Sequence, residues 1–330
     1  MSVLLQVEGL EVQYRAPGGL GDLIARRPRR VTRAVNGISF EIEKGDTLGL
    51  VGESGCGKST LGRALLRLTP AAGGKVRFAG EDVLGMPAEK LLAFRRRAQM
   101  VFQDPFASLN PRLTVAETLG EVLAVHRLCS PREVASRVRE LMARVGLPWE
   151  FAGRRAAALS GGQCQRVGIA RAMVLAPRLL VCDEPVSALD APTQQQIVAL
   201  LAELRAASGM ALLFISHNLA LVRRLCERVL VLYLGRMMEL APTAALFAAP
   251  RHPYSRELLA AIPVADPDIQ PARLAHVRAG EPPSPLSPPS GCVYRTRCPQ
   301  AAAVCAERIP HWEEPGGEQG IACHRWREIS

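Results

Sequence analysis

The sequence contains no hydrophobic run long enough to cross a membrane. Its most apolar stretch, residues 210–222, is shorter than the roughly 18 residues that a membrane span needs and is interrupted by Ser216, His217 and Asn218. The first residues also lack the basic segment and the following apolar segment of a secretory signal peptide. We therefore expect a chain that does not cross the bilayer and that stays in the cytosol.

The sequence also has no internal repeat, and at 48% hydrophobic residues it is too apolar to be disordered. Its 330 residues are enough for one α/β catalytic domain and a smaller appendage. The formal net charge of +10 favours anionic neighbours such as nucleotides, nucleic acid or the inner-leaflet lipid surface. Charge does not choose among these neighbours, so the motifs must decide the function.

Disulfide bonds are not expected, because a cytosolic chain meets a reducing environment. Five of the nine cysteines stand singly along the chain, which is typical of packing residues: Cys56, Cys129, Cys164, Cys182 and Cys226. The other four lie within the last forty or so residues: Cys292, Cys298, Cys305 and Cys323. Their concentration in one segment requires a separate explanation.

Short apolar runs alternate with helix-length segments along most of the chain. This order predicts an α/β domain with a largely parallel sheet. The expected strands are 37–42, 47–51, 99–102, 178–182 and 211–215. The expected helices are 59–68, 114–126 and 131–146.

The composition changes near residue 245, where the strand and helix pattern weakens, and residues 263–289 are rich in proline. We expect a main domain over 1–245, with a helical insert around 104–158, and a C-terminal extension over 246–330. Residues 16–30 are expected to form a loop between two strands, and they contain a cluster of four arginines. This loop is either a solvated insertion or a contact for anionic lipid or a partner protein.

A glycine-rich segment fits the phosphate-binding pattern G-x-x-x-x-G-K-[ST], and it follows an expected strand and opens an expected helix, as that pattern requires. Its backbone N–H groups are expected to close around the phosphates of ATP, Lys58 to reach the β- and γ-phosphates, and Ser59 to ligate Mg²⁺. The residues expected to contact the nucleotide are Gly52, Glu53, Ser54, Gly55, Cys56, Gly57, Lys58, Ser59 and Thr60.

Two carboxylates, Asp183 and Glu184, end the apolar strand-like segment that begins at Leu179. Because the carboxyl ends of parallel strands meet at one edge of a sheet, this placement predicts acids beside the phosphate-binding loop. Asp183 is expected to hold Mg²⁺. Glu184 is expected to accept a proton from the water that attacks the γ-phosphate.

A second glycine-rich motif, Leu-Ser-Gly-Gly-Gln, precedes another helix-like segment. Ser160, with Gly161, Gly162 and Gln163, predicts a second helix N-terminus that suits an anion. One chain therefore carries two expected phosphate-binding helix starts.

Together these motifs resemble those of the ATP-binding-cassette (ABC) ATPases. The resemblance implies a head-to-tail dimer, in which the serine-glycine motif of one protomer caps the γ-phosphate bound by the other. It also implies that Gln103 senses Mg²⁺ and the permease, that Asp190 acts across the dimer and that His217 contacts the γ-phosphate. Tyr14 resembles the aromatic residue that stacks on adenine, and a half-buried strand tyrosine is the alternative.

The amino-acid sequences of several segments narrow the resemblance to one branch of this family. VGESGCGKSTLGRALLRL, QMVFQDPFASLNPRLTV, VCDEPVSALD and RHPYSRELLAAIP resemble the peptide and nickel importer branch, most of all the second ATPase subunit of dipeptide and oligopeptide importers. Cys164 departs from the arginine usual in this branch, which leaves the orientation of its helix open, and the segment from Asp190 to Gln194 is also atypical. The resemblance covers roughly residues 3–262.

The four late cysteines resemble a C-terminal pattern that holds a [4Fe–4S] cluster in some importer ATPases. Four thiolates are the right number for such a cluster. Their spacing lacks the paired C-x₂-C arrangement of most structural zinc sites, although His324 could replace one ligand. An iron–sulfur cluster, zinc and no metal remain the three alternatives.

The expected fold is an α/β P-loop NTPase of the ABC type, with a parallel-sheet core, an antiparallel β subdomain, an α-helical signature subdomain and a small cysteine-containing C-terminal domain. The resemblance implies an ATPase that uses ATP and Mg²⁺ at the cytoplasmic face of the inner membrane to energise peptide import. Its expected partners are two permease subunits, a second ABC ATPase subunit or a second copy of itself, and an extracytoplasmic solute-binding protein.

Two alternatives remain beside this expectation. One is an importer ATPase for nickel or another small solute. The other is a cytosolic ABC ATPase acting on nucleic acid or ribosomes, which the positive charge suits. The latter usually carries two cassettes or long coiled-coil arms, and this chain has neither, so no nucleic-acid partner is expected.

Overall fold

A computed structural model describes residues 2–15, 31–262, 283–316 and 319–328. The loop expected at 16–30 and most of the proline-rich stretch 263–289 lie outside the described residues. The chain forms two compact units, one of residues 1–2, 43–46 and 86–216 and the other of residues 3–42, 47–85 and 217–330. Within the described residues, no helix has the length and apolar character needed to cross a membrane.

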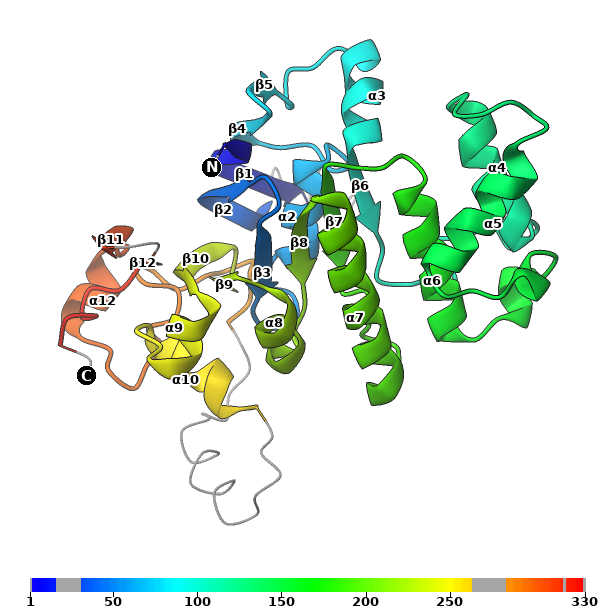
Figure 1. Cartoon of the computed structure of the whole chain (residues 1–330). Coiled ribbons are helices and arrows are strands. Elements are labelled where there is room, and N and C mark those ends of the chain that lie inside the picture. Colours follow the sequence, from blue (N-terminus) through cyan, green and yellow to red (C-terminus); the bar gives the residue numbers. More distant parts are fainter. Residues whose placement is uncertain (1, 16–30, 263–282, 317–318, 329–330) are drawn as a thin grey trace, which may run out of the picture. The chain divides into compact units, whose positions relative to one another are not determined.

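The first unit has a parallel three-stranded core with helices packed around it (Figure 1). Strand β7 pairs with β6 on one side and β8 on the other, with Asp183 opposite Ile215 at the carboxyl end. Its elements are α3 Ala88–Arg97, β6 Ala98–Val101, α4 Val115–Val125, α5 Val134–Arg144, α6 Gly161–Met173, β7 Leu179–Asp183, α7 Ala191–Ser208 and β8 Ala211–Ile215, with short 3₁₀ turns at Trp149–Phe151 and Ala156–Ala158.

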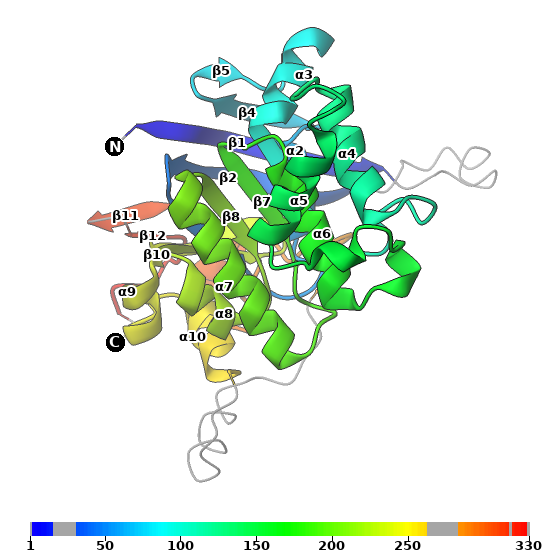
Figure 2. The ribbon, with the colours of Figure 1, turned by 45° about the vertical axis from the view of Figure 1, so that its right-hand side comes forward.

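Sequence patterns explain the elements of this unit. Every residue of β7 and β8 is buried, as expected for continuous apolar runs in a parallel sheet. Helix α4 begins with a capping box between Thr114 and Glu117, which satisfies two N–H groups of its first turn. Helices α4 and α5 lie beside α6 in both ribbon views (Figures 1 and 2). They fall within the range 104–158, whose limits as a subdomain stay a prediction.

The second unit contains an antiparallel sheet in the order β2-β1-β4-β5, in which β1 pairs with β4 and β4 with β5 (Figure 2). It also contains strands in the order β11-β12-β10-β9-β3, of which only β3 and β9 are parallel neighbours. Its strands are β1 Val3–Arg15, β2 Val31–Glu43, β3 Thr47–Val51, β4 Gly73–Phe78, β5 Glu81–Asp82, β9 Arg228–Tyr233, β10 Arg236–Pro242, β11 Glu313–Gly316 and β12 Gln319–Ile321.

The helices of this unit lie along the chain on both sides of residue 245: α2 Lys58–Leu65, α8 Leu219–Leu225, α9 Thr243–Ala248, α10 Pro253–Ala260 and α12 Ala303–Glu307. Residue 245 itself falls inside α9, and β10 before it pairs with β12 after it. The C-terminal segment is thus built onto the same unit as the glycine-rich loop that follows β3. The division of the sequence near residue 245 stays a prediction.

The antiparallel sheet and the parallel strands confirm the expected α/β architecture. The strands expected at 47–51 and 211–215 have those bounds, and those expected at 99–102 and 178–182 differ by one residue at each end. The helices expected at 59–68, 114–126 and 131–146 are present, and each of their ends differs from the expected one by one to three residues. Such differences at helix ends are usual, because terminal turns fray.

Candidate functional site

The glycine-rich loop between β3 and α2 has a backbone that only glycine can adopt at two positions. Gly52 has φ +150° and Gly57 has φ +104°. A Cβ atom on Gly52 would lie 2.2 Å from the carbonyl oxygen of Leu232, and one on Gly57 would lie 2.1 Å from the carbonyl oxygen of Ala34. Both contacts are with backbone, so a side chain at either position would displace the loop.

The start of α2 lies at the end of this loop. Gly57 is the N-cap, and no side chain caps the first turn. Glycine has no side chain that could cap this turn, and the N–H groups at a helix start are suited to phosphate oxygens. Lys58 is 4% exposed, and its Nζ donates to the carbonyl oxygens of Gly52 and Glu53 at 2.8 and 2.9 Å. A lysine, a serine hydroxyl at Ser59 and a row of N–H groups form a donor set that fits Mg-ATP phosphates.

Tyr14 lies in β1, in the same unit as the loop. The residue is 45% exposed, and its Oη lies 3.4 Å from Oγ1 of Thr60 in α2. An exposed aromatic ring beside the first turn of α2 suits a stacking role. That role stays a prediction. A residue of strand β1 that is 45% exposed also fits the alternative of a half-buried strand tyrosine.

The two carboxylates at the end of β7, Asp183 and Glu184, have different environments. Asp183 ends β7 and is completely buried, whereas Glu184, the next residue, is partly exposed. Glu184 has φ +44°, a conformation that is unusual for a residue with a side chain, and its N–H donates to the carbonyl of Ile215 at 3.0 Å. Such backbone outliers cluster at functional sites.

Gln103 contacts the carboxylate of Glu184. Its Nε2 donates to Oε2 of Glu184 at 3.2 Å, although 81 residues separate them in sequence. The structure thus brings together two residues that the sequence assigns to Mg²⁺ and water. The hydrogen bond orients the Glu184 carboxylate, and a carboxylate is a group that can accept a proton.

The serine-glycine motif begins helix α6, as expected. Ser160 is the N-cap and forms a capping box with Gln163, since the Gln163 N–H donates to the Ser160 hydroxyl at 3.3 Å and Gln163 Oε1 accepts the Ser160 N–H at 2.9 Å. Cys164 is completely buried inside the unit, and burial raises the pKa of its thiol to about 11. The cysteine is therefore a neutral packing residue within a regularly capped helix.

The glycines of this motif pack closely against the segment that follows Glu184. A Cβ on Gly162 would lie 2.5 Å from Cγ2 of Thr193, and one on Gly161 would lie 3.1 Å from a methyl group of Leu189. Asp190 caps helix α7, with its Oδ1 accepting the N–H of Thr193 at 2.9 Å and its Oδ2 accepting the Thr193 hydroxyl at 2.8 Å. Asp190 therefore has a local role, and its action across a dimer stays a prediction.

His217 is the first residue of the third segment of the second unit and lies two residues after β8. Its side chain is exposed, and the next residue, Asn218, caps helix α8 by accepting the N–H groups of Ala220 and Leu221. An exposed histidine before a capped helix is accessible to a ligand. Its contact with a γ-phosphate stays a prediction.

The four late cysteines line one small pocket of about 10 Å³, together with His324. Burial raises the pKa of Cys323 to about 11 and also raises the pKa of Cys292. Among the residues that the structure describes, no three His, Cys, Asp or Glu side chains are grouped closely enough to hold a metal ion. The donor set is therefore right in kind for an iron–sulfur cluster, but the present spacing of the thiols is not.

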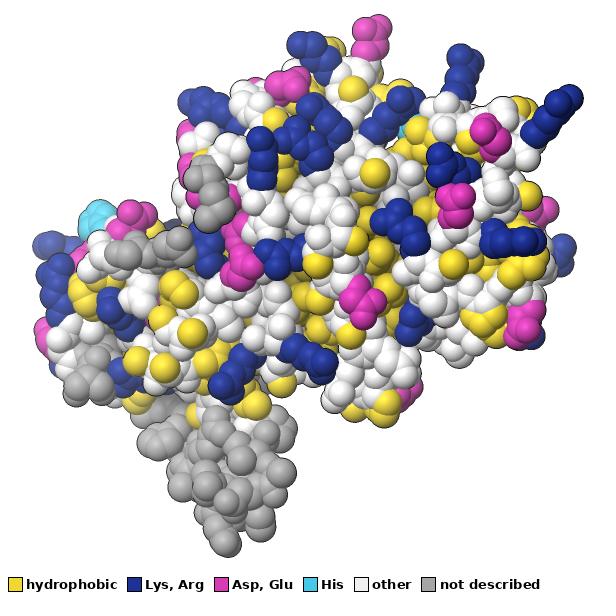
Figure 3. Space-filling view, viewed as in Figure 1, with side chains coloured by type: hydrophobic (Ala, Val, Ile, Leu, Met, Phe, Trp, Pro, Cys, Tyr) yellow, Lys and Arg dark blue, Asp and Glu magenta, His cyan; other side chains and the backbone are white. Residues whose placement is uncertain are grey.

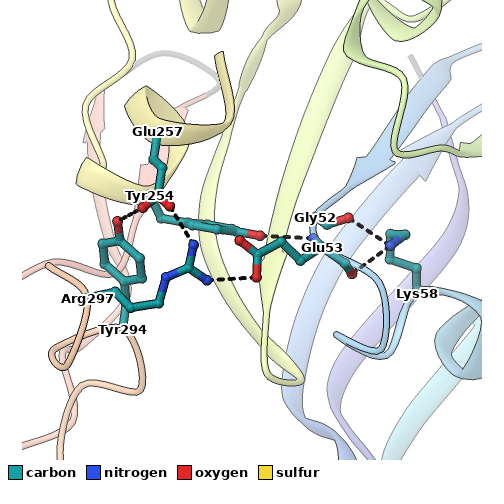
Figure 4. Close-up of polar contacts among 7 residues, drawn as sticks. All are labelled: Gly52, Glu53, Lys58, Tyr254, Glu257, Tyr294 and Arg297. Carbon is teal, nitrogen blue, oxygen red and sulfur yellow. Dashed lines mark hydrogen bonds and ion pairs between the residues drawn. The ribbon is translucent and has the colours of Figure 1, made fainter. Parts of the chain in front are cut away.

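Several residues behind the glycine-rich loop were not expected from the sequence. Tyr254, Glu257, Tyr294 and Arg297 form polar contacts that reach Glu53 of the loop (Figure 4). They lie in the segments RHPYSRELLAAIP and GCVYRTRCP, which carry part of the family resemblance. Nothing in the local sequence pattern shows that these segments meet the loop.

Comparisons with known protein families give two matches along the chain. The family described as "ABC transporter" matches residues 35–187. The family described as "Oligopeptide/dipeptide transporter, C-terminal region" matches residues 238–305. The first match contains the glycine-rich loop, Gln103, the serine-glycine motif and the two carboxylates, and the second contains Tyr254 and Arg297.

Similar proteins cover nearly the whole chain. The oligopeptide transport ATP-binding protein OppF of Salmonella typhimurium is 46% identical over 309 residues, which is 93% of this chain and 92% of that protein. The oligopeptide transport ATP-binding protein AppF of Bacillus subtilis is 48% identical over 293 residues, which is 88% of this chain and 89% of that protein.

Solved structures of ATP-binding cassettes have the same fold. One is a dimeric cassette in a post-hydrolysis state bound to ADP and Pi, with a TM-score of 0.64 and 26% identity over 73% of this chain and 99% of that one. Another is cbiO1 of Clostridium perfringens, part of the ABC transporter complex cbiONQ, with a TM-score of 0.64 and 26% identity over 76% of this chain and 92% of that one.

Proposed function

Because this chain belongs to the ABC transporter ATPases, in the branch that shares the oligopeptide and dipeptide transporter C-terminal region, we propose that it hydrolyses Mg-ATP to energise peptide import. The observation that carries this proposal is the 46% identity to an oligopeptide transport ATP-binding protein over 93% of the chain. The identity extends well beyond the ATPase motifs into the C-terminal segment.

The phosphate-binding half of the reaction rests on the second unit. The N–H groups of the first turn of α2 and the ammonium group of Lys58 bind the phosphates of ATP. Mg²⁺, when bound, neutralises phosphate charge, and Ser59, Asp183 and Gln103 supply oxygen ligands or hold water ligands. The glycine backbone of the loop allows this approach, because any Cβ at Gly52 or Gly57 would meet a carbonyl oxygen.

The hydrolytic half rests on the first unit. Glu184 accepts the proton from the attacking water, and Gln103 orients its carboxylate through their hydrogen bond of 3.2 Å. Glu184 directly follows the buried strand β7, and its positive φ sets the direction of its side chain at the end of that strand. From the second unit, His217 contacts the γ-phosphate and Tyr14 stacks on the adenine ring.

The working form is a head-to-tail dimer of ABC subunits. Ser160 and the N–H groups of Gly161 and Gly162 cap the γ-phosphate held by the opposing subunit, and Asp190 acts across the same interface. A helix N-terminus with small residues suits this role, because it lets the backbone approach an anion closely. The partner subunit is a second ABC ATPase of the complex or a second copy of this chain.

Two permease subunits bind beside Gln103, at the cytoplasmic face of the inner membrane, and an extracytoplasmic solute-binding protein delivers the peptide. Phe106, three residues after Gln103, is 47% exposed, and Val125 at the end of α4 is 68% exposed. Over α4 and α5, Figure 3 shows hydrophobic side chains interspersed with charged side chains of both signs. Such a surface suits a protein partner.

The test uses the complete complex in nanodiscs, with ATP hydrolysis measured with and without peptide-loaded binding proteins. Peptide should stimulate hydrolysis, and Glu184→Gln should lower kcat at least about 100-fold while nucleotide binding persists. Ser187→Ala, three residues further along the same segment, is the matched control and should keep its activity. Stimulation only by a nickel-loaded binding protein would show that the imported solute is nickel and not peptide. Full activity of Glu184→Gln would show that Glu184 is not the catalytic base.

We further propose that the four-cysteine pocket takes up a [4Fe–4S] cluster. The support is that Cys292, Cys298, Cys305 and Cys323 line the same pocket and equal the thiolate number of such a cluster. Loading would have to deprotonate the thiols and draw them together. Protein purified anaerobically should then contain about four irons and four acid-labile sulfides per chain. Zinc in their place would show a structural zinc site, and neither metal would make the pocket ordinary packing.

A further inference from the structure

Three of the four tyrosines in the chain form a buried cluster in the second unit. The ring centroid of Tyr233, at the end of β9, lies 4.7 Å from that of Tyr254 and 5.3 Å from that of Tyr294. All three residues are at most 1% exposed. Tyr254 comes from α10 and Tyr294 from the C-terminal cysteine segment. Edge-to-face rings packed this tightly form a rigid support.

Arg297 links this support to the glycine-rich loop (Figure 4). One nitrogen of its guanidinium donates to Oε2 of Glu53 at 2.8 Å, and the other donates to Oε1 of Glu257 in α10. Glu257 also accepts the hydroxyl of Tyr294. The Arg297 side chain is 10% exposed, Glu257 7% and Glu53 27%, so water screens these charges poorly.

Glu53 is held at its side chain, its N–H and its carbonyl. Its carboxylate accepts from Arg297, and its N–H donates to Oη of Tyr254 at 2.9 Å. Burial raises the pKa of Tyr254 well above its ordinary value, so this hydroxyl stays neutral and can accept the N–H. The carbonyl of Glu53 accepts from Nζ of Lys58 at 2.9 Å. A continuous chain of contacts therefore runs from Arg297 through Glu53 to Lys58.

The charges of this group explain why the arginine matters to an anion site. One guanidinium faces the two carboxylates of Glu53 and Glu257, and the Tyr294 hydroxyl gives Glu257 a second donor. If Arg297 were removed, Glu53 would keep a poorly screened negative charge inside the loop that receives phosphates. That charge would repel ATP and pull on the Lys58 ammonium group.

We propose that Arg297 is a positioning residue for the nucleotide site. It neutralises and holds Glu53, and it thereby sets the affinity of the loop for ATP without taking part in the chemical step. This inference rests on the proposed role of the glycine-rich loop in phosphate binding. It assigns a task in ATP binding to the C-terminal segment.

The backbone of the cysteine segment determines where Arg297 lies. The N–H groups of Arg297 and Cys298 both donate to the carbonyl of Tyr294 at 3.0 Å, and the N–H of Cys292 donates to the carbonyl of Cys305 at 2.8 Å. Arg297 thus sits in a tight turn between two of the four cysteines. Any change that loosens this turn should weaken ATP binding through the same arginine.

The test measures the Kd for a fluorescent ATP analogue, together with KM and kcat for ATP, on the full chain in its complex. Arg297→Gln should raise Kd and KM about tenfold and change kcat less than twofold. The double variant Glu53→Gln with Arg297→Gln should recover binding to within about threefold, because the unpaired carboxylate is gone. Purely structural damage would not be repaired in this way.

Arg295→Gln is the matched control, because Arg295 lies in the same turn but donates to Ser290 and not to the loop. It should leave Kd unchanged. An unchanged Kd in Arg297→Gln, or a double variant no better than the single one, would overturn the inference. If Arg297→Gln does not fold, Arg297→Lys decides instead: a loss of threefold or more supports the inference, and wild-type binding overturns it.

Lys58→Ala separates the inference from its premise. It should abolish binding of the analogue if the glycine-rich loop is the phosphate site. If Lys58→Ala binds normally, the proposed site is wrong whatever Arg297 does. If Lys58→Ala loses binding and Arg297→Gln does not, only the inference about Arg297 is wrong.

Discussion

Two glycine-rich helix starts, those of α2 and α6, are built on different principles. The start of α2 has no side-chain cap, and its N-cap Gly57 is confined by the backbone carbonyl of Ala34. The start of α6 has a complete capping box, and Gly162 is confined by a side-chain methyl of Thr193. Gly57 has no side chain that could cap α2, whereas the capping box of α6 satisfies the N–H groups of Ser160 and Gln163 and does not involve those of Gly161 and Gly162, which are the groups proposed to contact a phosphate.

The difference also determines how each start tolerates change. A backbone carbonyl cannot move without displacing a strand, but a methyl group can be removed by a single substitution. The α2 start should therefore be intolerant of any added atom. At the α6 start, a clash caused by an added atom should be relieved by a second substitution at Thr193, in the first turn of α7.

The largest effect is expected for Gly57→Ala. The new Cβ would lie 2.1 Å from the Ala34 oxygen, at a φ of +104° that alanine disfavours. We expect a cost of about 3 kcal/mol or more and at least a 100-fold loss of ATP affinity. Calorimetry and nucleotide titration would measure both. Gly55→Ala, with no atom within 4 Å of its Cβ, is the control and should lose less affinity.

A smaller effect, about 2 kcal/mol, is expected for Gly162→Ala, whose Cβ would lie 2.5 Å from Cγ2 of Thr193. Thr193→Ser removes that methyl and keeps the hydroxyl that donates to Asp190. The double variant should recover most of the lost thermal stability. If the double variant recovers none of the stability, the methyl group of Thr193 is not what confines Gly162.

A pH effect of similar size is expected in the support behind the α2 loop. His252 caps α10 by accepting the N–H of Tyr254 at 3.0 Å, and burial lowers the pKa of His252 to about 3 from an ordinary 6.5. Because the folded-state pKa is the lower one, the stabilisation is complete above pH 6.5 and is lost as pH falls toward 3.

Between pH 7 and 5 the loss from this histidine alone should be about 2 kcal/mol. His252→Asn keeps a capping side chain and cannot titrate in this range. Denaturant unfolding of both proteins at several pH values would isolate the difference. Equal pH slopes for the two proteins would contradict a buried neutral histidine.

The smallest effect is expected for Ser160→Ala, which removes the hydroxyl that accepts the Gln163 N–H. The loss of an N-cap costs about 1 kcal/mol. Ser160→Thr should keep the cap and most of the stability. A thermal midpoint unchanged by Ser160→Ala would show that α6 does not depend on its capping box.

Local patterns in the sequence predicted much of the fold. The apolar runs at 47–51 and 211–215 became β3 and β8, because such runs can only be buried between neighbours. Ser160 was expected to begin a helix and is its N-cap. These inferences succeeded because the information lies within a few residues.

Contacts between distant segments could not be predicted in this way. Gln103 and Glu184 are 81 residues apart, and Glu53 and Arg297 are 244 residues apart, and no periodicity marks either pair. The local cap that Asp190 provides was also missed, although an aspartate before Ala-Pro-Thr is a recognisable helix start.

The sequence by itself determined the local motifs of this protein: a glycine-rich loop before a helix, two carboxylates at a strand end and a capped glycine motif, each encoded by adjacent residues. Only the tertiary structure decided what holds these groups in place. The chain returns to the unit that contains β3 some 200 residues after that strand. This return creates the ion pairs of Arg297, the tyrosine cluster and the pairing of β10 with β12. Such contacts arise from packing and charge pairing in three dimensions, which adjacent residues do not specify.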